Sequence, residues 1–357
     1  MHNISIAGLG CHIPGGKVTN DDILATVADA NRTSLEADAL DLLLYGCRRK
    51  FDFLGISTRS APLAGSDDSF VSMAVRAARK ALAARTDDCR DPVDCIIACG
   101  ISNPFREPSA ACIIARELGI SPADHFDIND TCNGFLKAIE LASLYIASGT
   151  CRTILVVTAE NPPELANGLG MNLTVESVDE MDYRLSSCII GSGAAAMLLC
   201  SDTGKHRIVR YRNRKETTHW DSSLIRIPGT SMPETKYGKP IDGFWADGRG
   251  TAAELISANP AFVAESLTQW NLTPSDISFV VLHQLGANIT FAILDKLGIP
   301  HTKAPVNTFS ECGNMGSVNI PANLALAQDR GLLHDGDRIL LINSACGFTH
   351  AAALIEW

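Results

Sequence analysis

A cysteine at the end of an extended apolar segment is the first group in the sequence that could do chemistry. Residues 126–130 lead to Cys132, and Asn133-Gly134 then allow a tight turn into an apolar helix. A thiol at a helix N-terminus meets unpaired backbone N–H groups and the positive end of the helix dipole, which favour the nucleophilic thiolate. Free cysteine is also a common small core residue. This stretch alone leaves both interpretations open.

A histidine, an asparagine and a glycine occupy comparable places later in the chain. His283 ends an apolar strand expected over 279–283, and Asn314 lies in a glycine-rich turn. Taken singly, they are explained as a core or rim histidine and a turn asparagine. Together with Cys132 they form a nucleophile, an imidazole and an amide, each at a turn beyond a strand, where α/β sheets place ligands. The N–H groups of Gly347 and Cys132 would make an oxyanion hole, although a plain turn explains Gly347 equally well.

Composition limits the class of protein. The 357 residues are 46% hydrophobic and 20% charged, which is typical of a globular chain long enough for two core-forming units. Twelve cysteines without a CxxC pair or a basic leader predict free thiols and a reducing, cytoplasmic location. The longest apolar run is too short to span a membrane, and the net charge of −10 argues against nucleic-acid binding. Metal-ligand spacing is lacking and the glycine-rich stretches lack a nucleotide-binding context, so we predict neither metal nor cofactor.

The order of elements from about residue 94 recurs in the second part of the chain. Three pairs of landmarks repeat at a nearly constant offset: Leu118 and Leu297 (179 residues), Cys132 and Cys312 (180), and Ile154 and Ile339 (185). Such spacing indicates a duplicated α/β unit of roughly 180 residues. We predict two pseudo-symmetric halves, 1–200 with the nucleophilic cysteine and 201–357 with the histidine and asparagine. The polar stretch 210–250 is expected to form loops over the site, and the basic run 48–50 to lie in a loop.

Several short motifs along the chain recur in one enzyme family. They are Asp127-Ile128-Asn129 before Cys132-Asn133-Gly134-Phe135-Leu136, Pro108-Ser109-Ala110-Ala111, Leu54-Gly55-Ile56 with Arg59, Gly191-Ser192-Gly193-Ala194, His283-Gln284, Gly313-Asn314 with Ile320-Pro321, and Gly347-Phe348-Thr349. With them the sequence resembles, over nearly its full length, the β-ketoacyl-acyl-carrier-protein synthase III group of the thiolase-like superfamily. The resemblance implies an α/β fold, a five-layered αβαβα sandwich of two pseudo-symmetric halves, and a homodimer.

The resemblance also implies a reaction. Cys132 would take an acyl group from a CoA or acyl-carrier thioester, and His283 and Asn314 would support decarboxylation of a malonyl-type extender. The enolate would then attack the acyl-cysteine, with the N–H groups of Cys132 and Gly347 holding the oxyanion. A thiolate suits thioester exchange, and neutral imidazole and carboxamide donors suit an enolate oxygen.

Some positions depart from the family pattern. Glu107 stands where relatives carry an aromatic residue that reaches into the neighbouring subunit's acyl pocket, and we predict a substrate pocket that includes Glu107, Arg184 and Phe348. Basic carrier-docking positions have become Asn288 and Asp295, which favours a specialised-metabolite pathway.

Three functions remain open at this point. The first is the decarboxylative condensing enzyme. The second is an acyltransferase that moves the acyl group from Cys132 to an alcohol, amine or carbon nucleophile, with His283 as general base. The third is a non-catalytic partner subunit of a condensing complex, which leaves a hetero-oligomer open beside the homodimer. The presence of Asn314 favours condensation. A remaining basic cluster, Arg210 to Lys215, is either a carrier-docking patch or a solvated strand edge.

Overall fold

The strands form one nine-stranded sheet in which two half-sheets meet. The computed structural model describes residues 3–162, 173–226, 230–231, 233–238, 241 and 243–357, so residues 1–2, on which part of the leader expectation rests, and parts of 210–250 lie outside it. The strand order is β11-β12-β13-β8-β1-β7-β6-β4-β5. The bounds are β1 Ile4–His12, β4 Cys95–Cys99, β5 Asp124–Ile128, β6 Thr153–Glu160, β7 Gly193–Ser201, β8 Arg207–Lys215, β11 Phe279–Leu282, β12 Arg338–Ala345 and β13 Thr349–Glu356.

The two half-sheets share one arrangement. In the first, β4 is parallel to β6, and β7 and β1 follow antiparallel. In the second, β11 is parallel to β12, and β13 and β8 follow antiparallel. The halves join where β1 pairs with β8 through Ile4–Ile208 and Ser5–Arg207. This topology fits the predicted duplication. The division at residue 200 falls at the end of β7 and stays a prediction.

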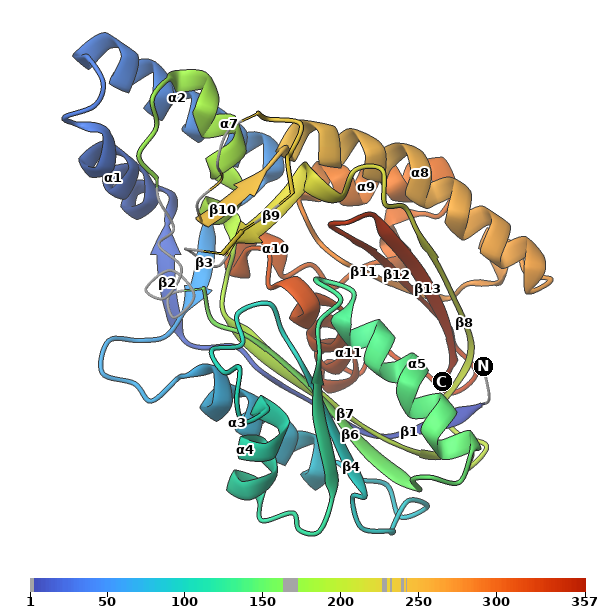
Figure 1. The fold of residues 1–357 in the computed structure, drawn as a ribbon. Coiled ribbons are helices and arrows are strands. Elements are labelled where there is room, and N and C mark those ends of the chain that lie inside the picture. The colour runs from blue at the N-terminus through green and yellow to red at the C-terminus, as the bar shows by residue number, and fades with distance from the viewer. Residues whose placement is uncertain (1–2, 163–172, 227–229, 232, 239–240, 242) are drawn as a thin grey trace.

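Helices add three layers to the two half-sheets (Figure 1). One outer layer packs on the first half-sheet and contains α3 (Phe70–Ala83) and α4 (Ala110–Leu118). The middle layer, α5 (Gly134–Ala147) and α11 (Asn319–Asp329), lies between the half-sheets. The other outer layer contains α8 (Gly248–Gln269) and α9 (Ala287–Leu297). The result is an αβαβα sandwich whose central core places the N-terminal end of α5 between both sheets.

Smaller elements gather at one end of the sandwich. The helices there are α1 (Asn20–Asn31), α2 (Ala37–Leu54), α7 (Met181–Arg184) and α10 (Phe309–Cys312), and the hairpins are β2 (Gly16–Thr19) with β3 (Thr58–Ala61) and β9 (Ser223–Arg226) with β10 (Gly243–Ala246). Among the described residues, no helix has the length and apolar character needed to cross a bilayer.

Local sequence explains where the helices begin and end. Thr19 and Ser69 accept from the backbone N–H three residues later and form capping boxes at the starts of α1 and α3. The left-handed residues Gly119 and Gly298 end α4 and α9, because glycine adopts positive φ at low cost.

Three expectations from the sequence are wrong in detail. The basic run 48–50 lies in α2 and not in a loop. Residues 210–215 belong to β8, a strand of the nine-stranded sheet, so the lining residues from the stretch 210–250 come only from its later part. The helix α5 is not buried all round, since Leu144 in its last turn is 51% exposed.

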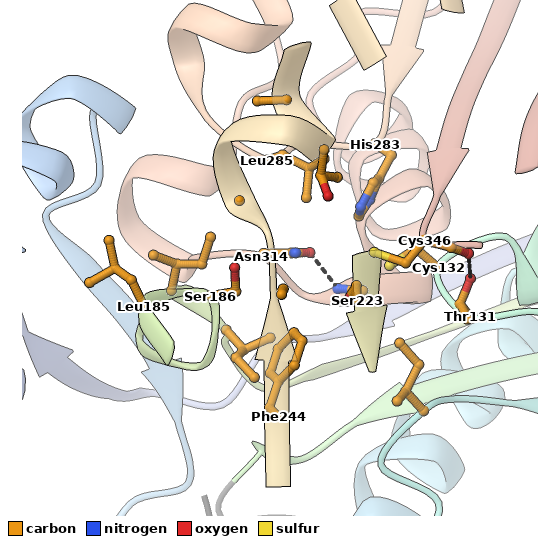
Figure 2. Close-up of a pocket in the computed structure, with 18 of the residues that line it drawn as sticks. Thr131, Cys132, Leu185, Ser186, Ser223, Phe244, His283, Leu285, Asn314 and Cys346 are labelled. Atoms are coloured by element: carbon orange, nitrogen blue, oxygen red, sulfur yellow. Dashed lines mark hydrogen bonds between the residues drawn. The ribbon is translucent and has the colours of Figure 1, made fainter. Parts of the chain in front are cut away.

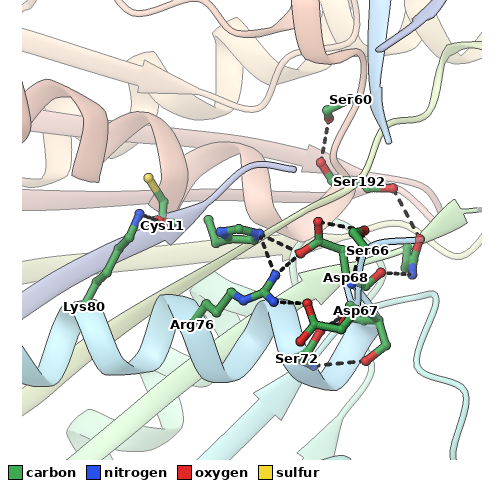
Figure 3. Close-up of polar contacts among 12 residues, drawn as sticks. Cys11, Ser60, Ser66, Asp67, Asp68, Ser72, Arg76, Lys80 and Ser192 are labelled. Atoms are coloured by element: carbon green, nitrogen blue, oxygen red, sulfur yellow. Dashed lines mark hydrogen bonds and ion pairs between the residues drawn. The ribbon is translucent and has the colours of Figure 1, made fainter. Parts of the chain in front are cut away.

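A polar network ties β1, α3 and the end of β6 together (Figure 3). His12 Nε2 lies 2.9 Å from Asp68 Oδ1, and Arg76 bridges Asp67 and Asp68. The Asn161 side chain donates to the Asp68 carbonyl at 3.3 Å. Because Asn161 directly follows Glu160, this network holds the end of β6 beside the candidate site.

Candidate active site

One cavity of about 490 Å³ receives all three residues predicted to carry the chemistry. Cys132, His283 and Asn314 line it together, from three different turns (Figure 2). Half of its other lining residues have apolar side chains: Phe53, Leu54, Ile101, Pro162, Leu185, Ile189, Ile190, Ile225, Phe244, Ala246, Ala252, Leu255, Leu285 and Ile289. Apolar side chains beside convergent polar groups suit an acyl chain that carries a thioester.

Cys132 lies between the end of β5 and the start of α5. Thr131 before it has a positive φ of 50°, a rare conformation for a residue that is not glycine, and its hydroxyl donates to the Cys346 carbonyl at 3.2 Å. The buried Asn133 side chain donates to Asp130 at 2.8 Å and accepts from Asn343 at 2.9 Å. These contacts hold the turn from both halves of the molecule and aim Cys132 into the cavity.

The expected bias of Cys132 toward thiolate is wrong for the free protein. Burial, followed by the nearby Cys346 and Glu160, raises the pKa of Cys132 well above 9.0, and a backbone hydrogen bond opposes this only in part. The cost of burying a charge therefore exceeds the gain from the helix N-terminus. Attack by Cys132 needs a base that removes its proton.

His283 follows β11, and its neighbour Gln284 anchors the turn. The Gln284 amide donates to the Val306 carbonyl at 3.0 Å and accepts from the Thr308 N–H at 3.0 Å. His283 is 7% exposed, and within the described part of the chain neither ring nitrogen has a partner of good geometry, although Asn319 lies close to the ring. Burial lowers the pKa of His283 to about 4, so the imidazole is neutral and able to accept or donate a proton.

Asn314 sits in a turn held against the first half of the chain. Its backbone N–H donates to the Ile189 carbonyl at 2.8 Å, and its carbonyl accepts from the Gly191 N–H at 3.0 Å. A Cβ at Gly191 would lie 1.8 Å from the Cys312 carbonyl oxygen, so only glycine permits this approach. Asn314 Oδ1 accepts from the Gly316 N–H at 2.8 Å, which leaves the amide NH₂ as the donor for a ligand.

A buried carboxylate in the cavity wall was missed from the sequence. Glu160 is 4% exposed and accepts four hydrogen bonds: from the N–H groups of Ile101 (3.0 Å) and Ser102 (3.0 Å) and from the hydroxyls of Ser102 (2.8 Å) and Ser317 (3.1 Å). Burial raises its pKa and the four donors oppose that rise. Because every contact is a donor, we assign Glu160 the ionised form. Its position at the end of an otherwise apolar strand was the available signal.

The remaining predicted site residues do not line this cavity. Glu107 lies exposed in the loop before α4. Arg184 is buried, with its guanidinium 4.8 Å from the Trp245 ring centroid and 3.4 Å from Glu180. Phe348 is buried with a φ of 41°. Gly347 has a φ of 73° and follows Cys346, which does line the cavity. Their assignment to an oxyanion hole and a substrate pocket stays a prediction.

Three of the four cations in the basic cluster on β8 contact carboxylates. Arg212 and Arg214 share Glu265, at 3.0 and 2.5 Å, and Lys215 lies 2.6 Å from Asp130. This favours the solvated strand edge over a docking patch. The cavity wall does carry two cations: Lys50 pairs with Asp182, and Arg249 lies 3.0 Å from the same carboxylate.

Other lining residues were also missed. Ser344 lies near the end of the apolar strand β12 and Cys346 follows that strand, and the β9–β10 hairpin contributes Ser223 and Phe244. In the described ranges, no group of three or more His, Cys, Asp or Glu side chains gathers to hold a metal ion.

Comparison with known proteins gives consistent matches. The family model for 3-oxoacyl-[acyl-carrier-protein (ACP)] synthase III matches residues 126–216, and the model for its C-terminal part matches residues 267–357. The β-ketoacyl-[acyl-carrier-protein] synthase III of Clostridium beijerinckii is 29% identical over 361 residues and 100% of both chains. That of Methylococcus capsulatus is 29% identical over 353 residues, or 99% of this chain and 98% of the relative.

Solved structures agree with this result. The 3-oxoacyl-[acyl-carrier-protein] synthase III of Aquifex aeolicus superposes with a TM-score of 0.78 at 25% identity, over 99% of this chain and 100% of that chain. A Cys-to-Ser variant of Xanthomonas campestris OleA with bound lauric acid and lauroyl-CoA superposes with a TM-score of 0.82 at 24% identity, over 100% of this chain and 99% of that chain. The predicted thiolase-like sandwich is confirmed.

Proposed function

Because the chain is a β-ketoacyl synthase III-like condensing enzyme of the thiolase-like superfamily, and so an acyltransferase, we propose that it acylates Cys132 and then carries out a decarboxylative Claisen condensation with a malonyl-type thioester. The observation that carries the proposal is the meeting of Cys132, His283 and Asn314 in one largely apolar cavity. An enzyme is also favoured over the non-catalytic partner subunit.

The first half-reaction is a thioester exchange. His283, a neutral imidazole, accepts the proton of the Cys132 thiol as sulfur attacks the acyl carbonyl. The C–S bond of the donor breaks, and the same proton passes to the leaving thiol. The apolar cavity wall then holds the acyl chain.

The second half-reaction forms the new carbon–carbon bond. The Asn314 NH₂ group and the neutral His283 ring donate to the thioester oxygen of the extender, where charge develops as carbon dioxide leaves. The enolate carbon attacks the acyl carbonyl, and the Cys132–acyl bond breaks. Donors without net charge suit both steps, because they bind the oxygen without trapping the extender carboxylate.

The test follows the acyl group by intact mass. Wild-type protein is incubated with a panel of acyl-CoA and acyl-carrier thioesters, and we expect an acyl adduct that Cys132→Ala lacks. Added malonyl thioester should then discharge the adduct with release of one carbon dioxide per β-ketoacyl product. His283→Ala and Asn314→Ala should retain a measurable adduct and lose carbon dioxide release by about 100-fold or more. An adduct on Cys132→Ala would refute the assignment.

A second candidate is condensation with a second acyl thioester without loss of carbon dioxide. Its support is the TM-score of 0.82 with OleA, whose structure holds lauric acid and lauroyl-CoA, together with the largely apolar cavity. Simple transfer to an alcohol, amine or carbon nucleophile stays the third. A product formed from two acyl-CoA molecules without malonyl thioester would favour the second candidate.

The remaining assignments concern substrate delivery and assembly. The loss of basic docking positions at Asn288 and Asp295 supports a specialised pathway, with CoA or an unusual carrier as donor. Exposed Glu107 fits a homodimer in which each subunit reaches the other's acyl pocket. Sedimentation should give a dimer, and Glu107→Phe should change the acyl-length preference. An unchanged preference would contradict the role of Glu107.

A further inference from the structure

A second polar cluster adjoins His283 and meets the acyl cavity at Ser344. Asn259 of α8, Ser344 of β12 and His350 of β13 are 0%, 6% and 1% exposed. The Asn259 amide donates to Ser344 Oγ at 2.7 Å, and Ser344 Oγ lies 3.0 Å from His350 Nδ1. Ser344 and His350 are cross-strand partners. The three side chains therefore form one connected unit between the second half-sheet and α8.

This unit is incomplete without a further hydrogen-bonding partner. A small cavity of about 10 Å³ is lined by His283, Asn259 and Ser344 together with apolar side chains. Among the described residues, Asn259 Oδ1 and both His283 ring nitrogens lack a partner of good geometry, although Asn319 lies close to the His283 ring. A space of this size with several polar partners holds one water molecule. Such a water would form hydrogen bonds with a His283 ring nitrogen, with Asn259 Oδ1 and with the Ser344 hydroxyl.

The far end of the unit faces charged groups near the surface. His350 Nε2 has no partner within the described part of the chain. The charges that act on His350 are Glu254 of α8, Arg214 of β8 and Glu216 after β8. Glu254 is partly exposed and Glu216 is exposed. Because Glu254 and Glu216 reach the surface, this is the side on which a relay through the buried His350 would meet solvent.

The proposed reaction consumes one proton per turnover. Acylation of Cys132 is neutral, since the thiol proton leaves with the departing thiol. In condensation, the bond between the malonyl carbon and its carboxylate breaks, a bond to the acyl carbon forms, and Cys132 leaves as a thiolate. Because the pKa of the buried Cys132 is raised, the thiolate must regain a proton before the next cycle. At that moment substrate and product occupy the open side of the cavity.

We propose that Ser344 and His350, with one ordered water and with Asn259 as the positioning residue that donates to Ser344, form a proton relay that leads from the α8 side to His283 and re-protonates Cys132. The proposal rests on the proposed function and assigns three residues to it. The proton moves from His350 Nδ1 to Ser344 Oγ, from Ser344 to the water, and from the water to His283, which passes a proton to Cys132 sulfur. No bond other than these N–H, O–H and S–H bonds changes.

The test separates acylation from condensation in Ser344→Ala and His350→Phe. We expect acylation of Cys132 within about twofold of wild type and condensation slower by about tenfold. Added imidazole, a small proton carrier that can enter the open cavity, should restore condensation in both variants and leave wild type unchanged. Ser266→Ala is the matched control, because Ser266 is a buried α8 serine that does not line either cavity.

Several results would overturn the relay. They are equal losses of acylation and condensation, a loss no larger than that of Ser266→Ala, or no response of the slowed variants to imidazole. A wild-type protein that forms the acyl-enzyme but no β-ketoacyl product would refute the proposed function instead. In that case a high-resolution crystal structure decides the site separately: an ordered water bound to His283, Asn259 and Ser344 supports it, and a dry cavity overturns it.

Discussion

Acid should destabilise this protein through His283, and the size of the effect follows from its burial. The pKa of His283 falls from the ordinary 6.5 to about 4 in the folded state. Between these values the unfolded chain binds a proton that the folded chain does not, so the free energy of unfolding falls as the pH falls from about 6.5 to about 4. A difference of about 2.5 pKa units corresponds to about 3 kcal/mol in full and to about 2 kcal/mol at pH 5.

The assay is urea unfolding at pH 7.5 and at pH 5.0, at one protein concentration, for wild type and His283→Gln. Every other titrating group, His350 included, is present in both proteins and cancels in the comparison. We expect wild type to lose about 2 kcal/mol more than the variant between the two pH values. If both proteins lose the same amount, His283 is not held neutral by burial, and the argument for a neutral imidazole in catalysis fails with it.

Further predictions concern the thiol, the buried carboxylate and the hairpin. Alkylation of Cys132 by iodoacetamide should rise about tenfold per pH unit from pH 6 to 9, and a plateau near neutrality would contradict the raised pKa. Glu160→Gln should move that pH dependence toward lower pH, as a fluorescence-based alkylation assay would detect. Gly316→Ala should lower the free energy of unfolding by about 1–3 kcal/mol, because Gly316 has a φ of 54° and a Cβ there would lie 2.8 Å from Glu160 Oε1. Gly331→Ala is its control, with a φ of 64° and open space around it, and should cost less in the same urea titration. Phe244→Ala should shift the acyl-CoA preference to longer chains, measured as relative acylation rates of Cys132.

Strands and helix ends could be predicted from the sequence because each depends on residues that are adjacent in the chain. The apolar stretches of β4, β6 and β11, the caps of α1 and α3, and the terminal glycines of α4 and α9 each depend on only a few adjacent positions. The meeting of Cys132, His283 and Asn314 was reached in a different way, from the repeat and the family resemblance. Spacing alone cannot show that three turns share one cavity.

The site features that were not predicted depend on contacts between residues that are distant in the sequence. Glu160 is a site residue because loop 101–102 and Ser317 supply its donors, and neither lies near it in sequence. Ser344 looks like an ordinary strand residue until Asn259 and His350 are seen beside it. The charge state of Cys132 was misjudged for the same reason, because the helix N-terminus is a local feature and burial is a global one.

The charge states in the cavity bear on how the carbon nucleophile forms. An imidazole with a pKa of about 4 is a weak base, so His283 is poorly suited to remove a proton from the carbon next to a thioester. The buried carboxylate of Glu160 also lines the cavity, but four hydrogen-bond donors occupy its oxygens and oppose the rise in pKa that burial causes, so it is not free to act as this base. Loss of carbon dioxide produces the same enolate without a base and needs only the donors that His283 and Asn314 provide. The residues of this subunit therefore favour decarboxylation. A condensation of two acyl thioesters without loss of carbon dioxide would require a base other than the described residues that line this cavity.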